Sequence, residues 1–286
     1  MRSENFGRKR ILFPALILAS MSVDPISRWV GADDADSSAA KPTIAKKVDD
    51  STRTDGVKIS SKHPLAPAVT AAISSRDSLA KIKEYSATFT KREQIKGQVM
   101  KSAMDIKVRQ EPFSVYLKYQ EPHAGREVLY VSGLNKGNFI VHEEGIKSLA
   151  GTLSLSPSGN EAMKENRYPV TEIGLHKMLD LLITQWEMEA KYGEIAVKQS
   201  DEKVGDVDCK AFEATHSQQR AHFKFHKTKL FISKETNLPI RLEQFGFPQK
   251  PGDTAPVVEE YTYSNIQTDG GISDTDFDRK NKSYRF

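Results

Sequence analysis

The chain has 286 residues, of which 38% are hydrophobic and 28% are charged. With a mean hydropathy of −0.53, this composition is typical of a soluble globular protein with one fair-sized core or two small ones. The sequence contains no run of about 18 or more apolar residues, so we expect no ordinary membrane-spanning helix. The formal net charge is only +4, which is poor evidence for binding to nucleic acid, and we expect no nucleic-acid partner.

Residues 1–32 have the three parts of a secretory signal peptide. Basic residues among the first ten positions precede an apolar run over residues 11–21, and Val30–Ala32 offers small residues for cleavage. This segment holds five basic and two acidic residues, so the remaining chain has a net charge of about +1. We therefore expect export to the periplasm. An uncleaved N-terminal anchor is the alternative, because the region around Trp29 is long for a cleavage region.

Cys209 is the only cysteine, so an intrachain disulfide is impossible even in an oxidising compartment. In the stretch VDCKAF it shares one face of an expected strand with Val207 and Ala211. This pattern favours a small buried side chain over a reactive thiol.

A disordered linker is predicted over residues 33–63, because Asp, Ser, Lys and Ala dominate this segment and large apolar residues are almost absent. A single domain is expected over residues 64–286. Its first element is a helix from Pro67 to Glu84, where apolar residues recur at helical spacing and Pro67 suits the first turn.

Strands joined by short turns follow this helix. Apolar and polar side chains alternate in them, which is the pattern of a strand with one buried face. The expected strands span residues 85–90, 100–109, 113–120, 128–133 and 139–142. Because a parallel sheet would need long crossover connections, the short turns favour an antiparallel meander.

The second half of the chain begins with an expected loop over residues 151–168, followed by a helix from Thr171, as its N-cap, to about Ala190. The helix has a continuous apolar stripe formed by Leu175, Met178, Leu179, Leu182, Ile183 and Trp186. Further strands are predicted over residues 194–203, 207–216, 222–233, 239–247 and 257–265. The fold class is therefore α+β, with an antiparallel sheet of about ten strands.

No familiar catalytic or phosphate-binding motif is present, so we expect neither an enzyme nor a cofactor. His222 and His226 lie four residues apart on an expected strand, which places them about 13 Å apart, too far for one metal ion unless a bulge intervenes. The acidic residues of SDTDFD alternate as in a calcium loop, but the required glycine and the final glutamate are missing. We therefore expect no metal site, and a strand-like tail in which Phe277 packs while the acidic side chains stay in solvent.

Several stretches resemble known families. The helix followed by YSATFTKRE (85–93), EPFSVYLKYQEP (111–122) and VLYVSG (128–133) resembles the start of periplasmic lipoprotein carriers and outer-membrane lipoprotein acceptors. A later stretch, ISKETNLPIRLEQF (232–245), is similar to that superfamily and to a related periplasmic sensor that restrains an anti-sigma protease cascade.

A closer resemblance, over about residues 75–286, is to an uncharacterised family of exported bacterial domains. The shared stretches are FSVYLKY, GREVLYV, RYPVTEIG, EYTYSNI and a tail of the form DFD-x-x-N-x-x-Y-x-F. This family brings no established activity.

The resemblance to the carriers implies a half-barrel, in which a curved antiparallel sheet has helices packed on its concave side and an apolar cavity holds acyl chains. No carrier motif assigns ligand-binding residues in this chain, so the candidate cavity is taken from the inward-facing apolar positions. These candidate residues are Met100, Met104, Ile106, Val108, Phe113, Val115, Leu117, Tyr119, Leu175, Met178 and Leu182. The same residues would equally serve as an ordinary core packed against the second helix.

Two functions are consistent with these observations. The first is a non-catalytic periplasmic protein that binds a lipid, an acyl chain or a lipidated protein. The second is an envelope-stress sensor or scaffold that binds the periplasmic domain of an envelope membrane protein. A carrier requires an open apolar cavity, whereas a scaffold can have a filled core and an exposed apolar patch.

Overall fold

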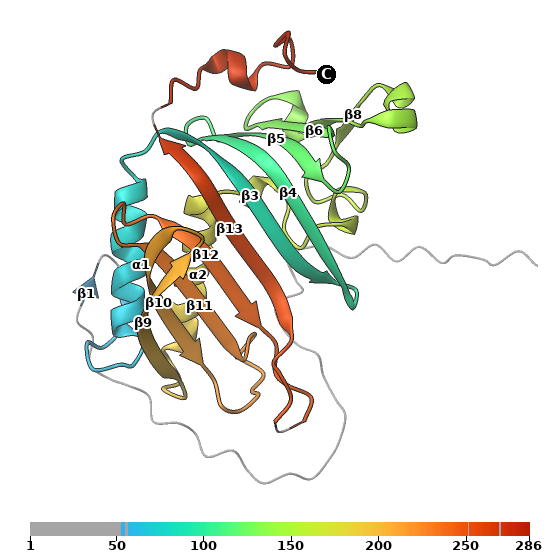
Figure 1. Ribbon diagram of the computed structural model, residues 1–286. Coiled ribbons are helices and arrows are strands. Elements are labelled where there is room, and N and C mark those ends of the chain that lie inside the picture. Colours follow the sequence, from blue (N-terminus) through green and yellow to red (C-terminus); the bar gives the residue numbers. More distant parts are fainter. Residues whose placement is uncertain (1–52, 55–56, 251, 269) are drawn as a thin grey trace, which may run out of the picture. The chain divides into compact units, whose positions relative to one another are not determined.

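The computed structural model describes residues 53–54, 57–250, 252–268 and 270–286, and Figure 1 shows their arrangement. All of these residues belong to one compact unit, Ile44–Phe286. The predicted signal peptide and most of the predicted linker lie outside the described residues. At the end of the linker range, Ile59, Ser60 and His63 are buried, so packing against the domain begins at least as early as Ile59.

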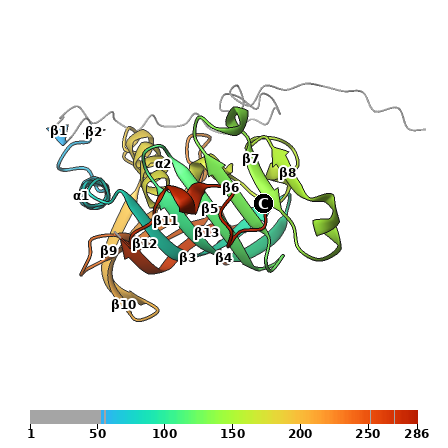
Figure 2. The ribbon, with the colours of Figure 1, turned by 90° about the horizontal axis from the view of Figure 1, so that it is seen from above.

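An open antiparallel sheet of eleven strands forms the body of the domain. The strand order is β8-β7-β6-β5-β4-β3-β13-β12-β11-β10-β9, so two meanders join where β3 pairs with β13. The strands are β3 (Glu84–Ile95), β4 (Gln98–Arg109), β5 (Ser114–Glu121), β6 (Glu127–Val131), β7 (Phe139–His142), β8 (Thr152–Leu155), β9 (Ala196–Val204), β10 (Val207–Thr215), β11 (Lys227–Ser233), β12 (Pro239–Phe245) and β13 (Val257–Thr268). The free edges, β8 and β9, lie on opposite sides in Figure 2. The short strands β1 (Arg53–Thr54) and β2 (Val57–Lys58) pair only with each other.

Two α-helices complete the fold in the part of the chain that the structure describes: α1 (Ala66–Leu79) and α2 (Leu175–Glu189). Their buried residues join the inward residues of both meanders in one core cluster, and Figure 1 shows α1 beside the β9–β11 part of the sheet. The predicted α+β class, with a curved antiparallel sheet and helices on one face, is therefore confirmed. None of the helices in the described part of the chain is long and apolar enough to cross a membrane.

The start of α2 differs from the prediction. Thr171 was expected as the N-cap, but it lies in a separate 3-10 helix, Val170–Glu172, and α2 begins at Leu175. The reason is a contact with the sheet: the N–H of Leu175 donates to the hydroxyl of Tyr85 at 2.8 Å, and the N–H of Gly174 donates to the hydroxyl of Tyr263 at 3.2 Å. These tyrosines satisfy N–H groups that a helix start leaves without partners.

Other elements also differ from the predictions, and several strands are longer or shorter than expected: β3, for example, runs to Ile95 instead of residue 90. The first helix ends at Leu79, because Glu84 is already paired with Arg109 of β4. The expected loop over residues 151–168 contains the edge strand β8, which pairs with β7. The strand expected from His222 begins only at Lys227. The tail forms a 3-10 helix, Asp274–Phe277, capped by Ser273, rather than a strand.

The C-terminal tail covers part of the outer face of the sheet, over β5, β6 and β7. Phe277 is buried, as predicted, in a second cluster that also contains Tyr116, Leu129 and Ile140. The ring of Tyr284 stacks on Tyr116 with 4.1 Å between centroids. The outer face of β5 and β6 is therefore buried as well as the inner face.

Candidate functional site

The structure brings most of the predicted cavity residues together. Strands β4 and β5 pair Met104 with Tyr119, Ile106 with Leu117, and Val108 with Val115. These six residues and Leu175, Met178 and Leu182 of α2 are at most 9% exposed and belong to the main core cluster. Phe113 is half-buried against that cluster, whereas Met100 is half-buried outside it among the described residues. In this conformation, the wall of the sheet packs against α2.

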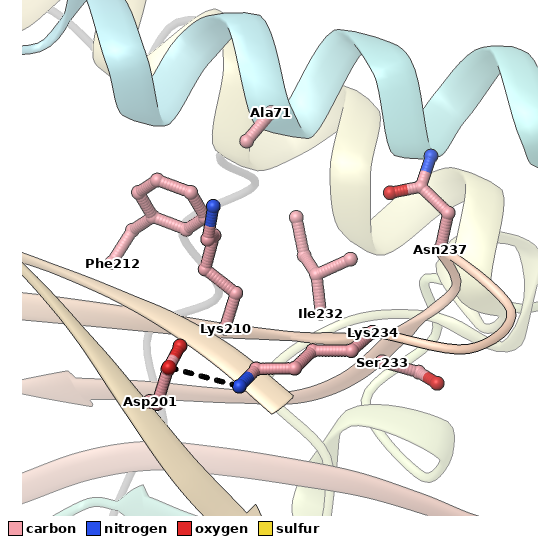
Figure 3. Close-up of a pocket in the computed structure, with 8 residues that line it drawn as sticks. All are labelled: Ala71, Asp201, Lys210, Phe212, Ile232, Ser233, Lys234 and Asn237. Carbon is pink, nitrogen blue, oxygen red and sulfur yellow. Dashed lines mark ion pairs between the residues drawn. The ribbon is translucent and has the colours of Figure 1, made fainter. Parts of the chain in front are cut away.

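A pocket opens at another part of the same core, between α1 and the strands β9–β11 (Figure 3). Its volume is about 410 Å³, which lies within the range of small-molecule sites. The lining residues are Ala71, Asp201, Lys210, Phe212, Ile232, Ser233, Lys234 and Asn237. Phe212 and Ile232 are members of the main core cluster and Ala71 packs against it. The apolar floor of the pocket is therefore continuous with the interior that contains the predicted wall.

Charged side chains lie at the mouth of this pocket. Asp201 Oδ2 and Lys234 Nζ form an ion pair at 2.9 Å, drawn as a dashed line in Figure 3. Lys210 lines the same pocket and lies opposite Asp201 in the β9–β10 register. The pocket thus combines an apolar floor with a charged rim.

Asn237 fixes α1 to the sheet at the edge of the pocket. Its side-chain N–H groups donate to the carbonyl oxygen of Ser74 at 3.1 Å and to the hydroxyl of Ser78 at 2.9 Å. The hydroxyl of Ser75 donates to the carbonyl oxygen of Asn237 at 2.7 Å. Because Asn237 lies in the turn between β11 and β12, this clamp sets the distance between α1 and the floor of the pocket.

A second group of polar residues, centred on Lys91 and Glu93, joins β3 to β13 and to the segment after β8. Lys91 Nζ lies 2.8 Å from Glu93 Oε2, and both side chains are almost fully buried. Lys91 Nζ also donates to Asn166 Oδ1 at 2.5 Å, and the hydroxyl of Tyr261 donates to Glu93 Oε1 at 2.6 Å. The segment that follows β8 is therefore joined to β3 and β13 by buried charged contacts.

Arg167 and Tyr168 add further contacts between the segment after β8 and β13. Arg167 Nε donates to Glu259 Oε2 at 2.7 Å, and the hydroxyl of Tyr168 donates to Glu259 Oε1 at 3.1 Å. Burial raises the pKa of Glu259, although the positive charges of Lys224 and Arg167 oppose the rise. Removing one partner of such a buried pair leaves an uncompensated charge, so this network holds the segment in place.

Two polar residues of α2, Gln185 and Glu189, lie against the sheet, half-buried and buried respectively. Gln185 Nε2 donates to Glu189 Oε1 at 2.9 Å and to Thr228 Oγ1 at 3.2 Å, and Gln244 Nε2 donates to Gln185 Oε1 at 2.7 Å. Glu189 Oε2 lies 3.3 Å from His216 Nε2. These contacts were not predicted, because the apolar stripe of α2 gives no indication that its flanking polar residues are also covered.

The histidines and the acidic tail have structural partners. His216 stacks on Phe223 with 3.6 Å between ring centroids, and His222 stacks on Tyr192 at 3.7 Å. In the tail, Asp276 pairs with Lys107 at 2.6 Å, so the prediction that all of its acidic side chains remain in solvent is wrong. Within the described ranges, no three His, Cys, Asp or Glu side chains gather in a way that could hold a metal ion.

Cys209 is fully buried, as predicted, and burial raises the pKa of its thiol.

Sequence reasoning missed the pocket of Figure 3. Its residues come from α1, β9, β10, β11 and the turn after β11, and no short motif links these segments. The available signal was weak: Lys210 and Phe212 lie on the same face of a predicted strand. Only the pairing of distant segments shows that this face meets α1.

Solved structures of low sequence identity are similar to this chain. A putative outer membrane lipoprotein-sorting protein domain from Vibrio parahaemolyticus is 12% identical, with a TM-score of 0.33, over 72% of this chain and 97% of that one. The lipoprotein LppX from Mycobacterium tuberculosis is 11% identical, with a TM-score of 0.41, over 72% and 98% of the two chains. The MucA/MucB complex of Pseudomonas aeruginosa contains a chain that is 12% identical, with a TM-score of 0.39, over 74% of this chain and 60% of that one.

None of the curated proteins matches the chain in sequence. A family model does match, over residues 82–286, which include every strand of the large sheet and α2. The expectation of an uncharacterised domain family is confirmed by this match. The chain belongs to the family described as "Protein of unknown function (DUF1571)".

Proposed function

We propose that this domain is a non-catalytic periplasmic protein that binds an apolar chain, as part of a lipid, a free acyl molecule or a lipidated protein. The observation that carries the proposal is the pocket between α1 and β9–β11, whose apolar floor is continuous with the core behind it. An acyl chain entering there replaces contacts with water by contacts with Phe212 and Ile232. Each buried methylene contributes about 0.8 kcal/mol.

The predicted wall supplies the deeper part of the proposed binding region. Methionines such as Met104 and Met178 adapt their shape to irregular apolar partners, and both lie in the core that the pocket reaches. Because these side chains are packed in the present conformation, a long acyl chain requires α1 or α2 to move away from the sheet. The clamp by Asn237 is the contact that resists this movement for α1.

The lining of the pocket supports binding rather than catalysis. Ser233 is its one hydroxyl-bearing residue, and the Ser233 oxygen accepts a hydrogen bond from the N–H of Thr236. No histidine lies among the eight lining residues, and the one lining carboxylate, that of Asp201, is paired with Lys234.

The test is to measure ligand binding by the exported protein. Native mass spectrometry detects a bound ligand, and titration with a fluorescent fatty acid measures the affinity. Ala71→Trp fills the pocket from α1 and should weaken binding at least about tenfold, a loss of about 1.4 kcal/mol. Thr70→Trp places the same bulk at an exposed neighbouring position and should leave affinity unchanged. Equal affinities for the two variants, or no uptake of apolar probes by the parent protein, would contradict the proposal.

The second candidate function is a sensor or scaffold that binds the periplasmic domain of a membrane protein. It is favoured by Ile146 and Leu149, which are both 88% exposed in the short 3-10 helix before the edge strand β8. Exposed apolar side chains of this size at a sheet edge are typical of protein contacts. Replacing both by serine should abolish capture of such a partner while leaving fatty-acid uptake intact, whereas Ala71→Trp should have the opposite effect.

A further inference from the structure

The pocket between α1 and β9–β11 has one positive charge in excess. Two lysines and one aspartate line it, which gives a net charge of +1. Although Lys210 lies opposite Asp201 in the sheet, the Asp201 carboxylate pairs with Lys234 instead. No described residue forms an ion pair or a hydrogen bond with the Lys210 ammonium group.

The free cation lies directly beside the apolar floor. Lys210 and Phe212 are two residues apart on β10, so both side chains project from the same face of the sheet. In Figure 3 the Lys210 side chain extends from its strand toward α1, alongside the Phe212 ring, while Ile232 lies in the floor between the strand and the helix. A ligand whose tail contacts Phe212 and Ile232 therefore has its polar end next to the Lys210 ammonium group.

We infer that the ligand of this pocket is a monoanionic amphipath, with a carboxylate or phosphodiester headgroup on an apolar chain, and that Lys210 binds the headgroup. This inference rests on the proposed function, because it requires an apolar chain in the pocket. A single negative charge on the ligand neutralises the excess charge of the lining. Lysine suits this role because its ammonium group acts as a point charge toward carboxylates and phosphates, and charge-assisted hydrogen bonds are stronger than neutral ones.

The first experiment measures the affinity of the exported protein for matched ligands by isothermal titration. Palmitate and hexadecyl methyl phosphate each carry one negative charge, whereas palmityl alcohol has the same length of apolar chain without charge. Acetate and inorganic phosphate have the charge without the chain. The anionic amphipaths should bind about tenfold more tightly than the alcohol, and the small anions should not bind measurably.

Three variants then identify the group that recognises the charge. Lys210→Met keeps the apolar stem and should reduce the preference for palmitate over palmityl alcohol to about twofold or less. Asp201→Asn frees Lys234 and raises the net charge of the lining to +2, so it should increase the affinity for palmitate. Lys198→Met removes an exposed charge from β9, outside the pocket lining, and should change nothing.

The outcomes separate this inference from the function on which it rests. Equal binding of palmitate and palmityl alcohol by the parent protein, unchanged in Lys210→Met, overturns the headgroup assignment and leaves the apolar-chain function standing. Failure of both ligands to bind overturns both. Tight binding of inorganic phosphate alone identifies a small-anion site and also contradicts the assignment. Circular dichroism of each variant verifies that the fold is retained.

Discussion

Two tyrosine hydroxyls hold the beginning of α2 on the sheet. Tyr85 of β3 and Tyr263 of β13 accept hydrogen bonds from the N–H groups of Leu175 and Gly174, and all of these groups are buried. Burial raises the pKa of both tyrosines, so they remain neutral over the whole physiological range. The position of the helix that covers the sheet thus depends on single polar atoms within an apolar core.

Replacing Tyr85 by phenylalanine tests this dependence. The change removes the acceptor of the Leu175 N–H and leaves that donor buried without a partner, so the free energy of unfolding should fall by about 1–3 kcal/mol. Urea denaturation followed by tryptophan fluorescence measures the loss. Tyr130→Phe is the control. Tyr130 is also buried in the main core cluster, at 9% exposed, but its hydroxyl has no hydrogen-bond partner among the described residues. A loss of equal size in both variants would contradict the role of the Tyr85 hydroxyl.

Helix α1 shows how an element is held by a neighbouring turn. The helix buries one apolar face, including Ala72 and Ile73, and its last turns are fixed by Asn237 through Ser74 and Ser78. Asn237 has a φ of 56°, a left-handed conformation that asparagine and glycine adopt more readily than other residues. The turn therefore needs this residue type both for its backbone and for its clamp.

The variant Asn237→Gly separates these two roles. Glycine keeps the left-handed backbone but loses the side-chain amide, so α1 should open more often and its amide hydrogens should exchange about tenfold faster. Hydrogen exchange measured by mass spectrometry should show little change in α2, which serves as an internal reference. The control Asn135→Gly changes another left-handed asparagine, in the connection between β6 and β7. If the proposed function holds, Asn237→Gly also speeds the uptake of a fluorescent fatty acid.

At the scale of the whole molecule, the C-terminal tail docks on strands that lie far from it in the sequence. Asp276 binds Lys107 of β4 at 2.6 Å, and the N–H of Arg285 donates to Glu127 of β6 at 2.8 Å. Burial by itself would raise the pKa of Asp276, but hydrogen bonds from Lys107 and from the N–H of Ser273 outweigh it and lower the pKa below the ordinary 3.8. The tail is therefore docked by charge as well as by Phe277 and Tyr284.

The lowered pKa of Asp276 gives a pH dependence of tail docking. A depressed carboxyl pKa stabilises the docked state fully above pH 3.8, and this contribution is lost as the pH falls through the folded-state value. Amide exchange of residues 273–286, corrected for the intrinsic rate at each pH, should therefore increase below about pH 4. Asp276→Asn should raise the exchange rate at neutral pH and flatten the profile. A profile of the variant that matches the parent chain would exclude Asp276 as the titrating group.

The sequence predicted local structure well where the spacing of apolar residues along a single strand or helix determines which side is buried. Alternation in residues 113–120 correctly placed Val115, Leu117 and Tyr119 on the inner face of β5. The helical stripe from Leu175 to Trp186 likewise predicted the buried side of α2. Both predictions succeed because a side chain's direction follows from the period of its own element. The edge strand β8 was missed because its four residues are too few to show a clear alternation of apolar and polar side chains. The strand forms through its pairing with β7.

By itself the sequence determined the class of fold, the inner wall of the sheet and the burial of Cys209, since each follows from spacing within a few residues. Only the tertiary structure decided that Tyr116, on the expected polar face of β5, is covered by Tyr284. It also decided that Lys210 and Phe212 meet α1 to form a pocket. The physical reason is the same in both cases. Burial and charge pairing depend on which distant segment covers a face, and the period of a strand carries no information about that partner.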